Sequence, residues 1–125
     1  MICFDTFLLE DGIPIYLQII LFLKRGIASG QILHGDALPS RRVLSALLGV
    51  NPNTVQKAYH LLEEEGLILS QSGAKSVVNL TGGTMERVRQ ELLETDVRPL
   101  VNAMAQMGLT RAEALALVAK YWPEG

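Results

Sequence analysis

The chain has 125 residues, of which 49% are hydrophobic and 19% are charged, and its formal net charge is −2. This length suits one domain with or without a short appendage, and the composition excludes intrinsic disorder. The longest apolar stretch, residues 13–23, is interrupted by Gln18, whereas a membrane-spanning helix needs about 18 to 20 apolar residues. The early residues do not resemble a secretory signal, and the single cysteine, Cys3, cannot form an internal disulfide. These features predict a soluble protein of the reducing cytoplasm.

Charge is unevenly distributed along this acidic chain. Residues 24–59 contain five basic side chains against one acidic side chain, Asp36. Acidic residues gather instead at residues 63–65, where we expect the solvated end of a helix, and in the last third of the chain. A basic face can therefore exist on this protein despite its net charge.

The first predicted element is a helix between Pro14 and Gly30. Proline is accepted at a helix start and glycine stops a helix, and apolar residues recur between them every three to four positions. Its other side is apolar as well, through Tyr16, Leu17, Ile20 and Leu21. Such a helix should be covered on two faces, one of them open to a partner.

Two short helices with a tight turn between them follow. Ser40 is a suitable N-cap for the first, which ends at Gly49, and Asn51 with Pro52 starts the second, which ends at Gly66. The expected apolar stripe of the first helix is Val43, Leu44, Leu47 and Leu48, and that of the second is Thr54, Val55, Ala58, Leu61 and Leu62. This arrangement predicts a helix-turn-helix.

A hairpin and a helical tail complete the chain. Residues 67–69 and 76–80 are short apolar runs around a polar stretch that contains Gly73, which predicts a projecting wing. From Thr84 a long helix is expected to kink or restart near Asp96 because of Pro99. After Gly108, a capping box of Thr110 and Glu113 predicts a last helix. Its expected apolar face is Leu115, Val118, Ala119 and Trp122.

The tail helix carries a seam with heptad-like spacing. Five apolar side chains follow one another at intervals of 4, 3, 4 and 3 residues: Leu93, Val97, Leu100, Met104 and Met107. A seam of this kind is typical of helices that associate with another helix. We interpret these five residues as the dimerisation surface.

The helix after Asn51 places polar residues on one side, at Asn53, Gln56, Lys57 and His60. Asparagine and glutamine can bond adenine edges, lysine can reach guanine or phosphate, and a free helix N-terminus can face a phosphate. Any amphipathic helix has a polar face, but the second helix of a helix-turn-helix is the one that reads bases.

Further basic residues lie nearby. Two arginines, Arg41 and Arg42, stand where a helix N-terminus disfavours positive charge. They are either ordinary solvated charges or, as two such residues together suggest, contacts to an anionic partner. Lys75 falls at the wing tip, where it is either simply exposed or in contact with DNA.

Together, the elements described above and several short sequence strings resemble the winged-helix domain of the GntR family of bacterial transcription regulators. The matching segments, over about residues 10 to 80, are P-I-Y at 14–16, L-P-S-R-R at 38–42, L-G-V-N-P-N-T-V at 48–55 and L-E-E-E-G-L-I at 62–68. The short helical tail resembles the YtrA subfamily. One departure is that residues 73–77 keep only the first of the two glycines usual in the family's wing.

The resemblance implies a homodimer on an inverted-repeat operator, with recognition helices in successive major grooves, wings at the minor groove and repression of transport-related operons. The contacts it implies are Arg42, Asn51, Asn53, Thr54, Gln56 and Lys57. Ser40, Arg41 and Lys75 complete the predicted DNA-binding set.

Other chemistries find little support. His34 and His60 lie in different elements without a nearby cysteine or carboxylate cluster, and no phosphate loop or nucleophile elbow is visible. We therefore predict no metal, no cofactor and no enzyme activity. The alternative, given the acidic net charge, is a winged-helix module that binds protein without binding DNA.

The sequence thus predicts a mainly helical α+β protein. A winged helix-turn-helix domain is expected over residues 10–80 and a two-helix dimerisation appendage over residues 84–122.

Overall fold

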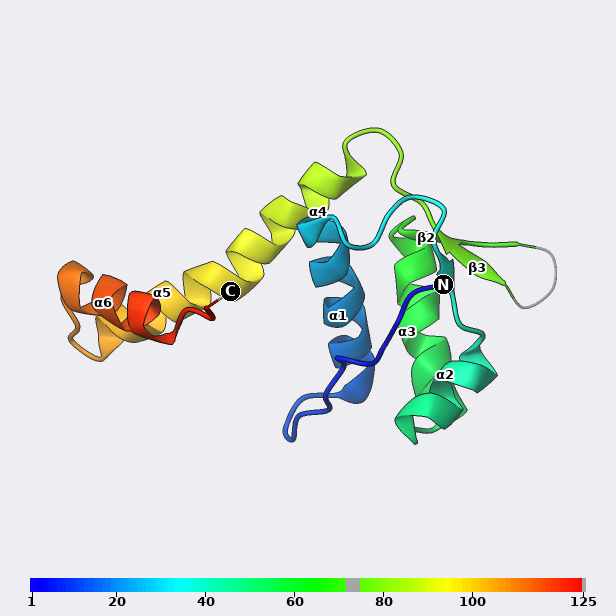
Figure 1. Cartoon of the computed structure of the whole chain (residues 1–125), viewed down its shortest axis with the longest axis horizontal. Helices are drawn as coiled ribbons and strands as arrows, with labels where there is room; N and C mark the ends of the chain where they lie inside the picture. The colour runs from blue at the N-terminus through cyan, green and yellow to red at the C-terminus, as the bar shows by residue number, and fades with distance from the viewer. Residues whose placement is uncertain (72–74, 125) are drawn as a thin grey trace. The chain divides into compact units, whose positions relative to one another are not determined.

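The computed structural model describes residues 1–71 and 75–124 and contains two compact units, residues 1–89 and 90–125. The first unit holds helices α1 (Ile15–Ser29), α2 (Arg41–Leu48) and α3 (Pro52–Glu64) and a three-stranded antiparallel sheet (Figure 1). The predicted fold class, mainly helical with a small sheet, is confirmed. Among the described residues, no helix combines the length and the apolar character needed to cross a membrane.

Helix α1 supplies much of the buried core of the first unit. Pro14 is the N-cap rather than the first helical residue, so the helix begins one residue later than expected, at Ile15. Gly30 ends the helix at φ 82°, with its N–H bonded to the Ile27 carbonyl. Ile19, Leu23 and Ile27 are almost fully buried. These side chains lie along one face, and α1 packs against α3.

The side of α1 that carries Gln18 and Phe22 is covered by the first residues of the chain. Phe4 stacks on Phe22 with ring centroids 5.0 Å apart, and Phe7 meets the same ring edge-on at 5.3 Å. The Gln18 side chain bonds both the N–H and the C=O of Glu10, at 2.8 and 2.9 Å. On the other apolar side expected for α1, Ile20 is buried inside the unit and so needs no partner, whereas Tyr16 and Leu21 are half-buried and Leu17 is 38% exposed.

Helix α2 differs from the expected stripe. Ser40 caps it as predicted, through a bond from the Val43 N–H, and Leu44 is fully buried. However, Val43 is 48% and Leu47 67% exposed, while Ser45 is buried. The helix has only two turns and packs on α3, so one narrow stripe is covered and the flanking apolar residues remain in solvent.

The sheet has the order β1 (Ala37–Leu38), β3 (Ser76–Val78), β2 (Ile68–Ser70). The predicted hairpin of β2 and β3 is confirmed, with Ile68 opposite Val78. The expected turn around Gly73 lies outside the described residues. Strand β1 was not predicted, because two residues are too few to show an alternating pattern.

The tail begins with α4 (Thr84–Leu92), which leads into a π-helical turn, η1 (Leu93–Val97), and then α5 (Arg98–Gln106). The irregularity predicted near Asp96 takes the form of this π-helical turn, through which the backbone stays helical rather than ending and restarting. Pro99 is the second residue of α5, a position where the missing N–H costs little. The wider π-helical turn η1 lies just before Pro99 and accommodates this proline within the helix.

Helix α6 (Arg111–Tyr121) has the predicted capping box. The Glu113 N–H donates to Thr110 Oγ1 at 3.1 Å, and the Thr110 N–H donates to Glu113 Oε1 at 2.9 Å. The carboxylate of Glu113 accepts hydrogen bonds from Thr110, first from its backbone N–H and then from its side chain, and these favour the ionised form and lower the pKa of Glu113.

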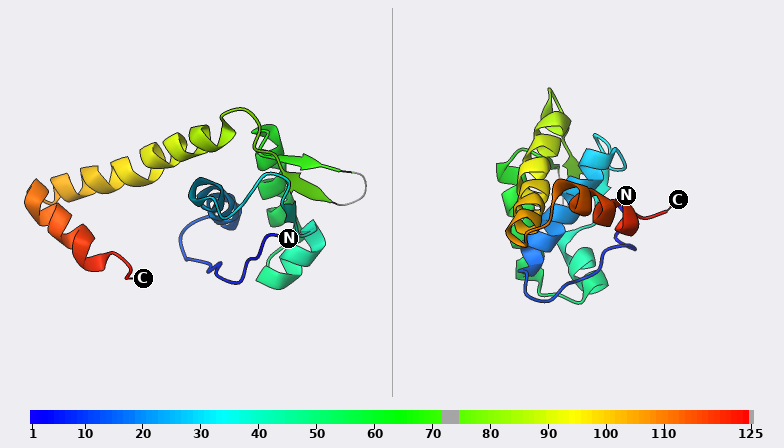
Figure 2. Two further views of the ribbon diagram at one scale, coloured as in Figure 1. Left: turned by 45° about the horizontal axis from the view of Figure 1, so that its top comes forward. Right: turned by 90° about the vertical axis from the view of Figure 1, so that its left-hand side faces the viewer.

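Helices α5 and α6 turn back on each other after Gly108, as Figure 2 shows. They enclose an apolar groove of about 410 Å³, which is lined by Leu100, Met104, Leu117, Val118, Tyr121, Trp122 and Pro123. In the single chain the expected seam remains open: Leu93, Val97, Leu100 and Met107 are exposed, and Met104 is half-buried.

Candidate nucleic-acid interface

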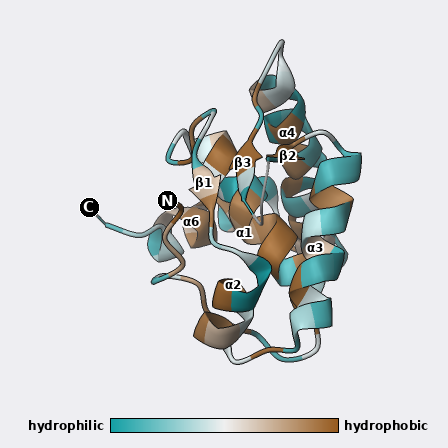
Figure 3. Ribbon diagram, turned by 90° about the vertical axis from the view of Figure 1, so that its right-hand side faces the viewer, coloured by the Kyte–Doolittle hydropathy of each residue, from teal (hydrophilic) through white to brown (hydrophobic). Residues whose placement is uncertain are grey.

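Helix α3 presents a polar face to solvent. Asn53, Gln56, Lys57 and His60 are exposed, while Val55, Ala58, Tyr59 and Leu62 are buried on the other side. Much of the α3 ribbon is hydrophilic in Figure 3. The N-cap Asn51 accepts the Asn53 N–H at 2.8 Å, which satisfies one of the free donors of the first turn. The structure thus gathers the predicted base-reading residues on one accessible surface.

Two members of this face also interact within the protein. The Lys57 ammonium lies 4.0 Å from the centroid of the Tyr16 ring, so α1 helps to hold this lysine. His60 Nε2 is 2.7 Å from Glu64 Oε1, one turn later on α3. Thr54 is only half-exposed at the first turn. Asn53 and Gln56 are therefore the residues best presented to a groove.

The other predicted contacts occupy the edges of this surface. Arg42 is exposed on the first turn of α2, whereas Ser40 is half-buried and engaged as the N-cap. Lys75 is exposed just before β3, and its carbonyl accepts the Gln71 N–H at 2.8 Å.

Arg41 does not point freely outward. Its Nη2 lies 3.0 Å from Glu63 Oε1, its guanidinium carbon lies 5.2 Å from the centre of the Tyr59 ring, and its side chain is 28% exposed. Arg41 therefore has internal partners that the sequence did not indicate.

In the expected solvated helix end at residues 63–65, Glu64 and Glu65 are exposed and Glu63 is half-buried, and two of the three carboxylates have partners on other elements. Glu63 pairs with Arg41 and also accepts the Ser70 hydroxyl at 2.7 Å. Glu65 pairs at 3.0 Å with Lys24 of α1, whose side chain is only 7% exposed. These partners are distant in the sequence, so no local pattern reveals them.

Tyr59 links α3 to the residues just before α2, a role that the sequence analysis missed. It is fully buried, and its hydroxyl donates to the Pro39 carbonyl at 2.7 Å, just before α2. Burial raises the pKa of Tyr59 well above its ordinary value, against an opposing effect of the Arg41 charge. The available signal was its position next to Ala58 and three residues before Leu62, on the apolar side of α3.

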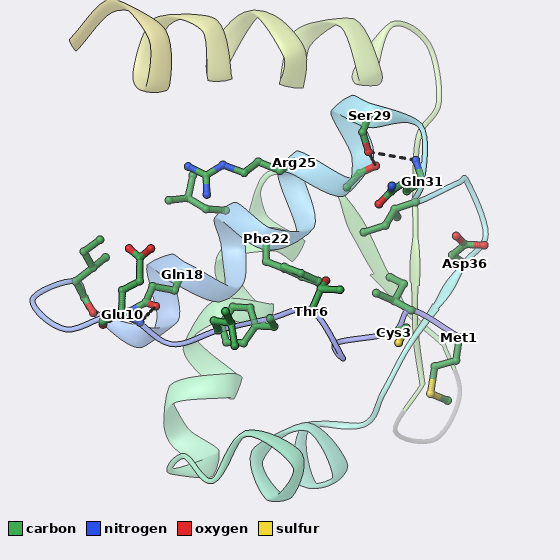
Figure 4. A pocket seen from close by; sticks show the side chains of 17 residues that line it. Met1, Cys3, Thr6, Glu10, Gln18, Phe22, Arg25, Ser29, Gln31 and Asp36 are labelled. Carbon is green, nitrogen blue, oxygen red and sulfur yellow. Dashed lines mark hydrogen bonds between the residues drawn. The ribbon is translucent and has the colours of Figure 1, made fainter. Parts of the chain in front are cut away.

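A separate cleft of about 750 Å³ lies between the first residues of the chain and α1 (Figure 4). Its lining mixes aromatic, polar and charged side chains, among them Phe22, Glu10 and Asp36. Within residues 1–71 and 75–124, no three histidine, cysteine or acidic side chains cluster as metal ligands would.

Three helices with a β2–β3 hairpin, and a polar face on the second helix of the helix-turn-helix, define the winged helix-turn-helix class of DNA-binding regulators. The family model described as "Bacterial regulatory proteins, gntR family" matches residues 15–78. The chain belongs to the GntR family and is a transcriptional regulator with a DNA-binding domain.

Curated relatives include the regulator YhcF of Bacillus subtilis, which is 30% identical over 106 residues that cover 85% of this chain and 88% of YhcF. The transcriptional repressor YtrA of the same species is 39% identical over 89 residues, which cover 66% of this chain and 68% of YtrA. These relatives are regulators rather than enzymes.

Solved structures give the same result. A GntR family regulator from Listeria monocytogenes has a TM-score of 0.78 at 29% identity, with 90% of this chain and 98% of that chain covered. YtrA from Sulfolobus acidocaldarius has a TM-score of 0.54 at 31% identity, with 90% of each chain covered. The similarity is consistent with the predicted YtrA-like subfamily.

Proposed function

We propose that this protein is a homodimeric repressor that reads an inverted-repeat operator with α3 and blocks a promoter. The observation that carries the proposal is the exposed polar face of α3, with Asn53 and Gln56 unobstructed beside the capped N-terminus. Amide side chains at this place suit adenine edges in the major groove.

Phosphate contacts would surround this base-reading centre. Arg42 and Lys75 are exposed cations at its borders, and Lys57 can bond a phosphate or a guanine from its place over Tyr16. Ser40, Asn51 and Thr54 lie at the first turns of α2 and α3, where backbone N–H groups favour an anion. Such contacts position the protein, while base contacts give specificity.

Dimerisation would be the role of residues 84–122. The five seam residues from Leu93 to Met107 are apolar, and four of them are exposed in the single chain, which favours burial against a second copy. Two recognition helices in one dimer would then reach half-sites one helical turn apart, about 34 to 36 Å.

Repression and the regulated genes rest on relatives. YtrA of B. subtilis is described as a transcriptional repressor, and the subfamily resemblance suggests a transport-related operon as the target. Occlusion of a promoter requires only tight operator binding, so no catalytic site is needed.

The proposal is tested by selecting binding sites from a random DNA pool with the full-length protein. We expect an inverted repeat, bound in gel-retardation assays and released as salt is raised. Promoter DNA carrying that repeat should be transcribed less when the protein is added. If no DNA is retained even at low salt, the alternative of a winged-helix module that binds only protein is favoured.

A further inference from the structure

One carboxylate joins three elements of the winged domain. Glu63 Oε1, on the last turn of α3, lies 3.0 Å from Arg41 Nη2 and 2.7 Å from Ser70 Oγ. Arg41 is the first residue of α2, and Ser70 is the last residue of β2 in the wing. We call Arg41, Glu63 and Ser70 the Glu63 clasp.

The same side of α3 fixes the chain that enters α2. Tyr59 lies one turn before Glu63, its hydroxyl bonds the Pro39 carbonyl at 2.7 Å, and its ring carries the Arg41 guanidinium at 5.2 Å. The arginine is thus held by a ring on one side and a carboxylate on another. It is 28% exposed, so little of it remains available to DNA.

We infer that Glu63 is a positioning residue that fixes α2 and the wing relative to the recognition helix, with Arg41 acting through it rather than as a phosphate contact. The inference rests on the proposed function, since a winged helix places α3 and the wing against DNA at the same time. Charge-assisted hydrogen bonds are stronger and shorter than neutral ones. A carboxylate is therefore suited to hold α2 and the wing in place relative to α3 while DNA is bound.

The first test separates position from charge. Glu63→Ala removes both bonds and should weaken operator binding about tenfold, which corresponds to 1.4 kcal/mol. Glu63→Gln keeps an acceptor oxygen while losing the charge, so it should bind within about threefold of the wild type. The matched control is Glu64→Ala, which makes the same charge change at a carboxylate that pairs with His60 on its own helix.

Charge alone would give a different order. A negative group near DNA opposes binding, so a purely electrostatic Glu63 would make all three variants bind equally or more tightly than the wild type. That order would overturn the inference.

The second test concerns Arg41. If Arg41 acts through Glu63, then Arg41→Ala should leave the slope of log affinity against log salt unchanged, and Arg41→Ala with Glu63→Ala should cost little more than either change alone. A phosphate contact would instead lower the slope by about one. A lowered slope with additive losses would refute the role of Arg41 in the clasp.

A DNA-free measurement keeps the clasp testable even if the operator proposal fails. Ser70→Ala removes one hydrogen bond at an exposed site and should leave the fold intact. In the free protein, hydrogen exchange should become faster at the amides of β2 and β3 and stay unchanged in α1. Unchanged exchange in the strands would show that the Ser70–Glu63 bond does not hold the wing.

Discussion

The buried hydroxyl of Tyr59 supplies a direct test of how the helix-turn-helix is assembled. Tyr59→Phe keeps the buried aromatic ring and its contact with the Arg41 guanidinium. It removes only the hydrogen bond to the Pro39 carbonyl. Any loss of stability therefore measures this one link between α3 and the entry to α2.

The structure sets the size of the effect. The bond is short, at 2.7 Å, and both Tyr59 and Pro39 are buried. A neutral hydrogen bond contributes about 0.5 to 1.5 kcal/mol net, and a buried carbonyl left without a partner costs about 1 to 3 kcal/mol. We expect Tyr59→Phe to lower the free energy of unfolding by about 1 to 2 kcal/mol.

The assay is urea unfolding followed by circular dichroism at the helix band. The single tryptophan, Trp122, lies in the other unit, so its fluorescence would not report on this site. The matched control is Tyr121→Phe, because that side chain is 74% exposed. If both variants unfold at the wild-type urea concentration with unchanged slopes, the hydroxyl does not stabilise the fold and the reasoning is wrong.

Three further predictions concern the DNA surface and pH. Asn53→Ala and Gln56→Ala should each cost about 1 to 3 kcal/mol on the operator and almost nothing on random DNA; equal losses on both would assign them to the backbone. Lys57→Ala should lower the salt slope of operator binding by about one if this lysine binds phosphate, as titration of affinity against salt would show. Because the pKa of Tyr59 is raised above its ordinary value of 10.0, the unfolded state loses its proton first as pH rises. Stability should thus be unaffected by Tyr59 below about pH 10 and fall above it, and urea unfolding should show a smaller fall in Tyr59→Phe.

Much of the fold could be predicted because its signals are local. The caps at Ser40, Asn51 and Thr110 bond amides two or three residues away, and the irregular turn η1 lies directly before Pro99. Such features depend on short stretches of chain and remain readable without tertiary context.

The features that the sequence does not reveal depend on tertiary contacts. The first residues of the chain carry no strong periodicity, yet Phe4 packs on Phe22 and the Ile2 N–H bonds the Ala37 carbonyl at 2.8 Å. The sequence predicts Arg41 as a DNA contact from its position at a helix start, but it does not indicate the internal partner that the structure shows, Glu63, 22 residues away. The spacing of residues along the sequence does not show which side chains of different elements pair with each other.

The last prediction concerns where the winged domain ends and how the dimer forms. Val88 of α4 is 3% exposed and belongs to the first unit, which extends to Arg89. A chain that ends at Gly83 would lose this buried side chain, which contributes about 1.5 to 3 kcal/mol. A chain that ends at Arg89 retains it, so we expect this shorter protein to be folded and monomeric.

In the full chain, Leu100→Asp should have the same effect on assembly. Leu100 is 54% exposed in the single chain. Two copies would each bury the remaining half of one such leucine, worth about 1.5 to 3 kcal/mol together. The matched control is Asn102→Asp, which introduces the same residue at an exposed position outside the seam. Sedimentation should show a monomer for Leu100→Asp and a dimer for the control. In a dimer, binding of one half-site holds the second subunit close to the other half-site, and a monomer lacks this advantage. Operator affinity should therefore fall about 100-fold or more while the preferred bases stay the same. A dimer at micromolar concentration for both Leu100→Asp and the chain ending at Arg89 would refute the seam, because the remaining interface would then have to lie within the winged domain itself.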